Sequence, residues 1–119
     1  MGNVTLVSLT EDNKVYPLLD QDENIVGRSI IEANDVNIFD STNKVSKRHC
    51  LIERKEGGYT IKDLDSDHGT YVNEKKIKES PLKNGDRLGL GLRYILKIKV
   101  EGAGLTFAEW KLKWKMKDY

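Results

Sequence analysis

Residues 48–64 read RHCLIERKEGGYTIKDL, and no other stretch of the chain says more about the fold class. Two runs rich in β-branched, aliphatic and aromatic residues, 48–54 and 59–64, flank the pair Gly57-Gly58. Glycine reaches positive φ without steric cost, so this pair favours a tight turn between antiparallel strands. The stretch therefore predicts a β-hairpin.

Similar short runs recur along the rest of the chain, separated by Gly, Asn, Asp and Pro, and no long run has the period of a helix. The other predicted strands are 4–9, 14–19, 23–28, 87–90 and 93–100. In the last of these, apolar residues at 94, 96, 98 and 100 alternate with their neighbours, which is typical of a strand with one buried face. The sequence thus predicts an all-β fold.

Composition limits the number of domains and the classes of function. The 119 residues are 38% hydrophobic and 33% charged, which is typical of one soluble globular domain. We assign residues 1–101 to a β-sandwich and 102–119 to a C-terminal extension. The net charge of +1 argues against binding nucleic acid directly through bulk charge.

Several other classes are excluded by what the sequence lacks. No apolar run approaches the length needed to span a bilayer, so no membrane association is expected. The single cysteine, Cys50, cannot form an internal disulfide and offers no thiolate cluster to a metal. We expect neither a metal site nor a cofactor, and a reducing compartment.

The C-terminal extension has a second alternating pattern. Lysines at 111, 113, 115 and 117 alternate with four large apolar residues, namely Trp110, Leu112, Trp114 and Met116. On a strand the lysines would share one face, which most often is solvated, and the apolar side chains would share the other. That apolar face is expected either to pack on the sandwich within the chain or to meet the same strand of a second copy in a homodimer.

Four loop motifs suggest a binding site. They are Gly27-Arg28 at a strand end, the run SKRH at 46–49, the run SDHGT at 66–70 and YVN at 71–73. Loops cluster at the ends of a β-sandwich, so an arginine, a serine and a lysine far apart in sequence can meet there. Guanidinium, ammonium and hydroxyl groups together favour an anion such as phosphate.

Together with LKNGD at 82–86, these motifs resemble the forkhead-associated (FHA) domain, a β-sandwich that binds phosphothreonine. The resemblance covers residues 4–100, with five motifs in family order and spacing. It implies an FHA-type sandwich of about eleven antiparallel or mixed strands, here extended by the C-terminal strand. It also implies a non-catalytic adaptor that binds a phosphothreonine-containing protein in kinase-dependent signalling.

The resemblance further implies roles for individual residues. Arg28 and Ser46 would hold the phosphate with Lys47 beside them, and Lys44 would favour an acidic residue three places after the phosphothreonine. The residues given structural roles are Gly27, His49, Gly69 and Thr70. Taken singly, Arg28 could instead be a surface charge and Ser46 a strand-entry cap.

Two residues depart from the family pattern in the loop that contacts the peptide. His68 stands where the family usually has asparagine, and Asp67 precedes it. A carboxylate about 4 Å from a phosphate repels it by roughly 1–4 kcal/mol per charge pair in a wet site. The alternative reading is therefore a homodimerisation module whose phosphopeptide pocket is weakened or lost.

An enzyme is not expected. Ser46 and His49 could be imagined as a hydrolytic triad with any of Asp63, Asp65 or Asp67, but Ser46 and His49, three residues apart on a strand, would point to opposite faces. The glycine pattern of a nucleophile elbow is also absent from the sequence. We therefore assign no catalytic residue.

The resemblance extends to FHA domains at the N-terminus of nuclear DNA-damage checkpoint mediators. On that basis the sequence analysis predicts a nuclear protein of the DNA-damage response, with the cytoplasm as the alternative location.

Overall fold

The short β-rich runs form strands throughout the computed structural model, which describes residues 4–11, 14–28, 34–38, 44–55, 57–91 and 94–100. These residues contain eleven strands and no helix. The strands are β1 (Val4–Ser8), β2 (Val15–Pro17), β3 (Glu23–Arg28), β4 (Val36–Ile38), β5 (Cys50–Lys55), β6 (Gly58–Asp63), β7 (Thr70–Val72), β8 (Lys75–Ile77), β9 (Glu79–Leu82), β10 (Arg87–Leu90) and β11 (Tyr94–Val100).

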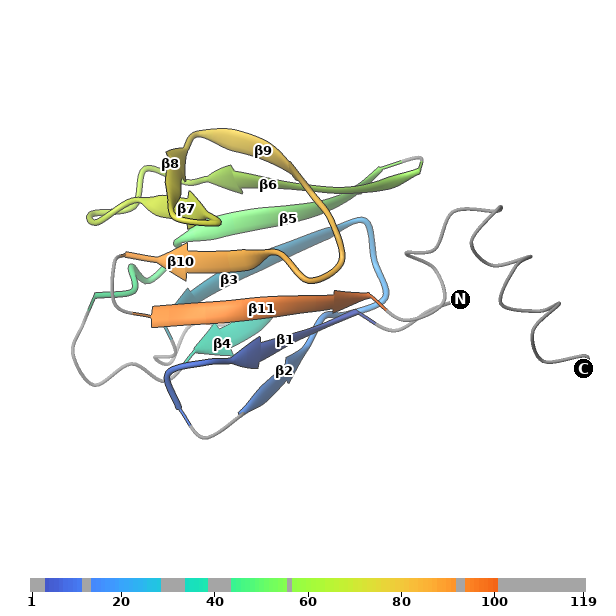
Figure 1. Cartoon of the computed structure of the whole chain (residues 1–119), viewed down its shortest axis with the longest axis horizontal. Helices are drawn as coiled ribbons and strands as arrows, with labels where there is room; N and C mark the ends of the chain where they lie inside the picture. Colours follow the sequence, from blue (N-terminus) through green and yellow to red (C-terminus); the bar gives the residue numbers. More distant parts are fainter. Residues whose placement is uncertain are drawn as a thin grey trace, which may run out of the picture.

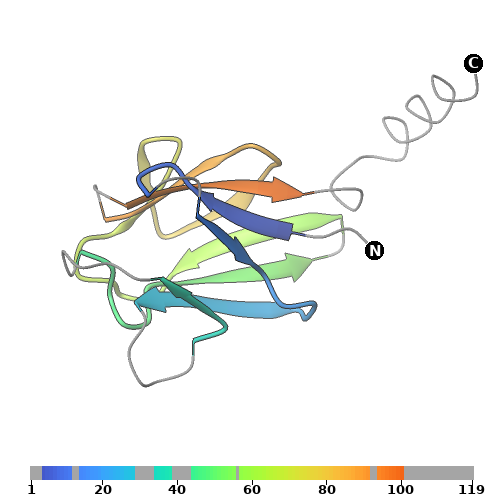
Figure 2. The same ribbon diagram turned by 90° about the horizontal axis from the view of Figure 1, so that it is seen from below.

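Two sheets pack face to face as a sandwich (Figures 1 and 2). One has the order β2-β1-β11-β10-β7-β8 and the other β4-β3-β5-β6-β9. Neighbouring strands are antiparallel except β3 and β4, which are parallel. The hairpin read from residues 48–64 is β5–β6, and Gly57 in its turn has φ +85°. The predicted all-β sandwich of mixed strands is confirmed.

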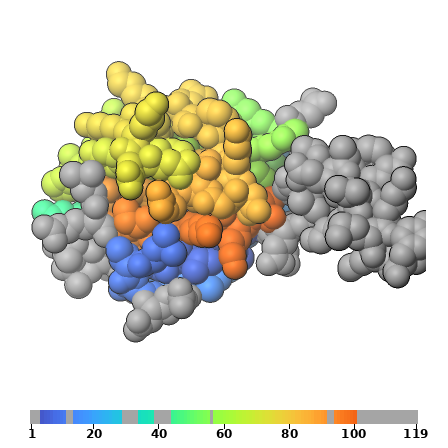
Figure 3. Space-filling view, viewed as in Figure 1, coloured from blue at the N-terminus to red at the C-terminus, as the bar shows by residue number. Residues whose placement is uncertain are grey.

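The core lies between the sheets. Along β11 the residues at 94, 96, 98 and 100 are buried, while Lys97 and Lys99 are exposed on the outer face. Figure 3 shows this outer face of the six-stranded sheet, with β10 and β11 in orange between β7 in yellow and β1 in blue. The largest fully buried aliphatic side chains are Leu6, Ile38, Ile52, Ile61, Leu88, Leu90, Leu96 and Ile98.

The strand directions bring the connections that carry three of the loop motifs to one end of the sandwich. β3, β4, β6 and β10 all run toward the same end, at the left of Figure 1, so the connections that follow them meet there. Val4 and Val100 pair with each other at the opposite end. Three of the four predicted loop motifs, at 27–28, 46–49 and 66–70, therefore lie at one end of the molecule.

The predicted strands match the observed ones to within one or two residues at each boundary. Four strands of three or four residues, β4, β7, β8 and β9, have no counterpart in the strand pattern of the sequence. The predicted C-terminal strand with Trp110, Leu112, Trp114 and Met116, and the proposed boundary between 101 and 102, lie outside the described residues.

Candidate phosphate-binding site

The site begins at the end of β3, where Gly27 leaves room for another loop. A Cβ atom at this position would lie 2.0 Å from the Lys47 carbonyl oxygen and 2.9 Å from Asn34 Nδ2. No side chain larger than hydrogen fits there unless the backbone moves. Glycine at 27 thus lets the loop that carries Ser46 and Lys47 lie directly against β3.

Arg28, the last residue of β3, is bound to this loop at two points. Its backbone N–H donates to the Ser46 carbonyl at 2.9 Å, and its Nε donates to the Val45 carbonyl at 2.9 Å. Val45 is fully buried, which anchors the loop in the core. Within the described residues the two Nη groups of Arg28 have no acceptor, so the outer edge of the guanidinium is available to a ligand.

Ser46 connects two loops through its hydroxyl oxygen. That oxygen accepts the backbone N–H of Asp67 at 2.9 Å. The hydroxyl hydrogen has no acceptor among the described residues and remains available to a further oxygen. Ser46 can therefore donate to an anion without giving up the contact that holds the next loop.

His49 is fully buried and links the same two loops from inside. Its Nδ1 accepts the Ser46 N–H at 3.0 Å, which places the proton on Nε2, and Nε2 donates to the Gly69 carbonyl at 2.8 Å. Burial lowers the pKa of His49 below its ordinary 6.5 and favours this neutral form. Because His49 contacts the Ser46 amide rather than the hydroxyl, it is not placed to activate that hydroxyl as a nucleophile.

A cluster around Asp63 shapes the loop between β6 and β7. Asp63 Oδ1 accepts the hydroxyl groups of Ser66 at 2.5 Å and Thr70 at 2.6 Å, and Ser66 Oγ accepts the Gly69 N–H at 3.0 Å. Burial acts to raise the pKa of Asp63, but these hydrogen bonds outweigh it and hold the pKa below its ordinary value. Gly69 has φ +85°, a conformation that glycine adopts without strain.

Asp63 and Asn34 are positioning residues that the motifs did not single out. Asn34 is buried, and its Nδ2 donates to the Lys47 carbonyl at 2.8 Å. The polar run DLDSDHGT at 63–70 was a signal for Asp63, because aspartate next to serine and threonine favours such turns. For Asn34 the local sequence offered no comparable signal.

The structure also places the residues of the ligand-facing loops. Lys47, Asp67 and His68 are exposed, and within the described part of the chain the Asp67 carboxylate forms no ion pair with Arg28 or Lys47. No carboxylate of the described residues thus forms an ion pair with either of these two cations. A Cβ at Gly91 would lie 3.3 Å from His68 Cβ and 3.6 Å from Lys44 Cβ, so Lys44 and His68 are neighbours across Gly91.

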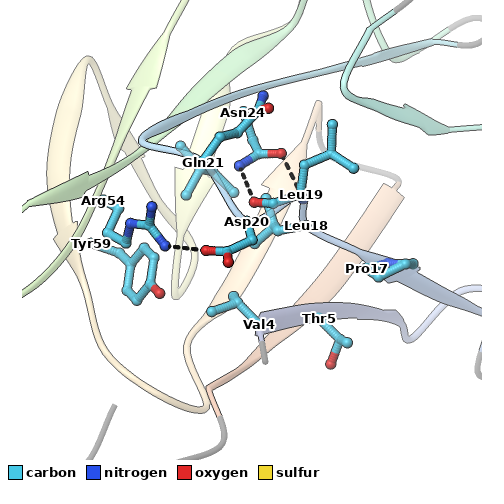
Figure 4. Close-up of a pocket in the computed structure, with 11 residues that line it drawn as sticks. Val4, Thr5, Pro17, Leu18, Leu19, Asp20, Gln21, Asn24, Arg54 and Tyr59 are labelled. Atoms are coloured by element: carbon cyan, nitrogen blue, oxygen red, sulfur yellow. Dashed lines mark hydrogen bonds and ion pairs between the residues drawn. The ribbon is translucent and has the colours of Figure 1, made fainter. Parts of the chain in front are cut away.

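A separate pocket of about 350 Å³ lies at the end of the sandwich where Val4 and Val100 pair (Figure 4). Arg54 lies at this pocket, but its guanidinium already pairs with Asp20 at 2.6 Å and with Asp22 at 3.2 Å. Figure 4 shows the first of these contacts as a dashed line. This pocket lacks the free cationic donors of the loop site, so we do not assign it to the phosphate.

The described residues contain no group of three or more His, Cys, Asp or Glu placed to hold a metal ion. Nor does this part of the chain contain a helix long and apolar enough to cross a membrane.

The chain is similar to proteins of known family. The model of the FHA domain family matches residues 24–91. The oxoglutarate dehydrogenase inhibitor of Corynebacterium jeikeium is 38% identical over 74 residues, which are 62% of this chain and 49% of the relative. The glycogen accumulation regulator GarA of Mycolicibacterium smegmatis is 35% identical over 74 residues, 62% of this chain and 44% of the relative.

The chain is also similar to a solved structure from a structural and functional study of phosphothreonine-dependent FHA domain interactions, with a TM-score of 0.70 and 28% sequence identity between the two chains. The match covers 82% of this chain and 95% of that one. In contrast, the chain spans about half the length of the curated relatives it matches. The similarity is thus one of the domain and not of the whole relatives.

The relatives bear on the predicted location and on the family of the chain. The predicted nuclear location is wrong, because the curated relatives come from bacteria, which have no nucleus. They also give no support to a checkpoint mediator or a DNA-damage role. The family match over residues 24–91, more than half of the chain, shows that the chain belongs to the FHA domain family, and the similar solved structure is of an FHA domain with phosphothreonine-dependent interactions.

Proposed function

We propose that this chain is a non-catalytic adaptor that binds phosphothreonine on a partner protein. In this proposal Arg28, Ser46 and Lys47 hold the phosphate, and association with the partner depends on a kinase. The two curated relatives are described as an inhibitor and a regulator, which supports an output through association.

The observation that carries the proposal is how the loop before β5 uses its hydrogen-bond acceptors. The carbonyl groups of Val45, Ser46 and Lys47 accept hydrogen bonds from Arg28 Nε, Arg28 N and Asn34 Nδ2, respectively. The carbonyl groups of three successive residues thus already accept hydrogen bonds, from the end of β3 and from Asn34 before β4. The groups left for a ligand are donors and cations, which suit an anion.

The free energies favour phosphate despite Asp67. Each hydrogen bond to a charged group contributes about 1.5–3 kcal/mol net, and Arg28, Ser46 and Lys47 supply at least three. Repulsion by the Asp67 carboxylate costs roughly 1–4 kcal/mol in a wet site. Attraction exceeds repulsion for phosphothreonine, whereas unmodified threonine brings no charge to pair with the cations.

Lys44 and His68 are proposed to read the residues that follow the phosphothreonine. Both lie beside Gly91, and His68 directly follows Asp67 in the same loop. The charge of Lys44 favours an acidic residue three places after the phosphothreonine, and the His68 imidazole offers one donor or acceptor to the peptide backbone.

Calorimetric titration with a phosphothreonine peptide that has Asp at the third following position tests the proposal. We expect binding to the phosphorylated peptide, no binding to its unmodified form, and loss of binding in Arg28→Ala. Arg54→Ala removes the same charge at the other end of the sandwich and should bind normally. If Arg28→Ala keeps full affinity, or the phosphopeptide does not bind at high micromolar concentration, the proposed site is wrong.

We also propose that the extension at 102–119 mediates homodimerisation. The support is the sequence alone, in which four large apolar side chains alternate with lysines. Light scattering on the intact chain and on a chain that ends at Gly102 tests this: a dimer that becomes a monomer on truncation supports it, and a monomer in both cases refutes it.

A further inference from the structure

The outer face of the six-stranded sheet has a groove outside the phosphate-binding loops. Its volume is about 380 Å³, and its lining residues are Tyr71, Glu74, Arg87, Gly89, Gly91 and Ile95. They come from β7, the turn after it, β10, the turn that follows β10, and β11, and Figure 3 shows the molecule from this side.

The groove exists because Gly89 has no side chain. In the sheet register, Gly89 pairs with Tyr71 on one side and with Ile95 on the other. A Cβ at this position would lie 3.1 Å from Tyr71 Cβ and 3.5 Å from Ile95 Cδ1. Tyr71 and Ile95, both half-buried, thus stand on either side of Gly89 and line the groove above the backbone of β10.

One end of the groove adjoins the proposed phosphopeptide site. The Gly91 N–H donates at 2.8 Å to the Gly69 carbonyl, the same carbonyl that accepts His49 Nε2. Lys44 and His68 lie next to Gly91, as described above. A peptide that passes Lys44 after its phosphothreonine therefore reaches the groove without crossing a gap.

The charges around the groove are mostly positive. Arg87 closes its far end with a long ion pair of 3.8 Å to Glu74, and both side chains are more than half exposed. Lys97 pairs with Arg87 in the register, and Lys76 pairs with Tyr71. Arg87 and Glu74 are the charged residues of the lining, and Lys97 and Lys76 beside it add positive charge, so the groove favours an acidic ligand.

We propose that this groove binds the continuation of the partner chain beyond the residue that Lys44 contacts. The segment is extended and acidic, and it places one apolar side chain between Tyr71 and Ile95. From Gly91 to Arg87 the groove follows four residue steps of β10, so about four further peptide residues span it. The inference rests on the proposed function and deepens it.

The test compares two phosphopeptides in calorimetric titrations. The short one ends at Asp in the third position after the phosphothreonine, and the long one adds six residues containing acidic side chains and one leucine. We expect the intact domain to bind the long peptide about tenfold more tightly, the gain from burying one apolar side chain. Ile95→Ala and Arg87→Glu should remove this gain while short-peptide affinity stays within about twofold, which also shows that the variants fold.

Lys99→Glu is the matched control for charge. It makes the same change as Arg87→Glu on the same face, but Lys99 pairs with Thr5 outside the groove, and it should retain most of the gain. Equal affinity for both peptides in the intact domain, or an equal loss in Lys99→Glu and Arg87→Glu, refutes the groove inference alone.

Two further outcomes separate this inference from its alternatives. Failure of the intact domain to bind either peptide overturns the proposed function and this inference with it. A change of oligomeric state in Ile95→Ala without peptide, measured by light scattering, shows that a second copy occupies the groove and also overturns the inference.

Discussion

His49→Phe tests whether the buried histidine holds the two ligand-facing loops together. Phenylalanine keeps an aromatic ring in the fully buried position but has no nitrogen. The Ser46 N–H then loses its acceptor, His49 Nδ1, and the Gly69 carbonyl loses the donor Nε2. The change removes hydrogen bonds while it leaves the ring volume largely in place.

The two losses differ in size. The Ser46 amide becomes an unsatisfied, partly buried donor, which costs about 1–3 kcal/mol. The Gly69 carbonyl still accepts the Gly91 N–H at 2.8 Å, so its lost bond costs only the net value of about 0.5–1.5 kcal/mol. We expect the free energy of unfolding to fall by about 2–4 kcal/mol.

Urea unfolding followed by circular dichroism measures this change. His68→Phe is the matched control, because His68 is the other histidine of the chain and is exposed, and its unfolding free energy should change by no more than about 0.5 kcal/mol. If His49→Phe is as stable as His68→Phe, the hydrogen bonds assigned to His49 do not hold the loops, and the account of the site is wrong.

Three further predictions follow from the same contacts. Burial keeps the pKa of His49 below 6.5 in the folded state, so as the pH falls the unfolded chain takes up a proton on this histidine before the folded chain does. The stability that depends on neutral His49 is therefore lost as the pH falls below about 6.5. The midpoint of urea unfolding should fall over this pH range in the intact chain and not in His49→Phe. Gly27→Ala places a Cβ 2.0 Å from the Lys47 carbonyl oxygen and should cost about 1–3 kcal/mol of stability together with phosphopeptide affinity, whereas Gly58→Ala, with nothing within 4 Å of its Cβ, should be tolerated in the same assays. Asp67→Asn removes about 1 kcal/mol of repulsion and should tighten phosphopeptide binding about fivefold in calorimetry; unchanged affinity would place that carboxylate away from the phosphate.

The strands that the sequence predicts are those with a strong local pattern. The hairpin at 48–64 and the alternating run at 93–100 appear as β5–β6 and β11 because side-chain period and turn residues are local properties. Strands such as β8 and β9 have only three or four residues, and β9 contains Pro81. Their pairing with β7 and β6 depends on neighbours that a local pattern does not reveal.

The same division applies to the site. The motifs pointed to Arg28, Ser46 and Lys47 because guanidinium, hydroxyl and ammonium groups have recognisable chemistry. The positioning role of Asn34 was missed because its contact with the Lys47 carbonyl forms only once the chain has folded, whereas Asp63 bonds to the nearby hydroxyls of Ser66 and Thr70 and had a local signal in the run 63–70. The type of a residue thus shows which groups can bind a ligand, whereas the residues that hold these groups in place depend on how the chain folds.

Substitution of a residue that contacts the phosphate should therefore weaken binding, whereas substitution of a residue that positions the loops should lower stability. Lys47 is exposed and forms no ion pair with a described carboxylate, so its removal should weaken phosphate binding while stability stays nearly unchanged. His49 is buried and bonded on both nitrogens, so its removal lowers stability first and affects binding only through the Ser46 loop. Arg28 belongs to both groups, because its Nε holds the Val45 carbonyl while its Nη groups remain for the ligand. Arg28→Lys would keep the positive charge, but an ammonium group cannot bind the Val45 carbonyl and a phosphate in the way that the two edges of the guanidinium can. We therefore expect Arg28→Lys to bind phosphopeptide more weakly than the intact domain.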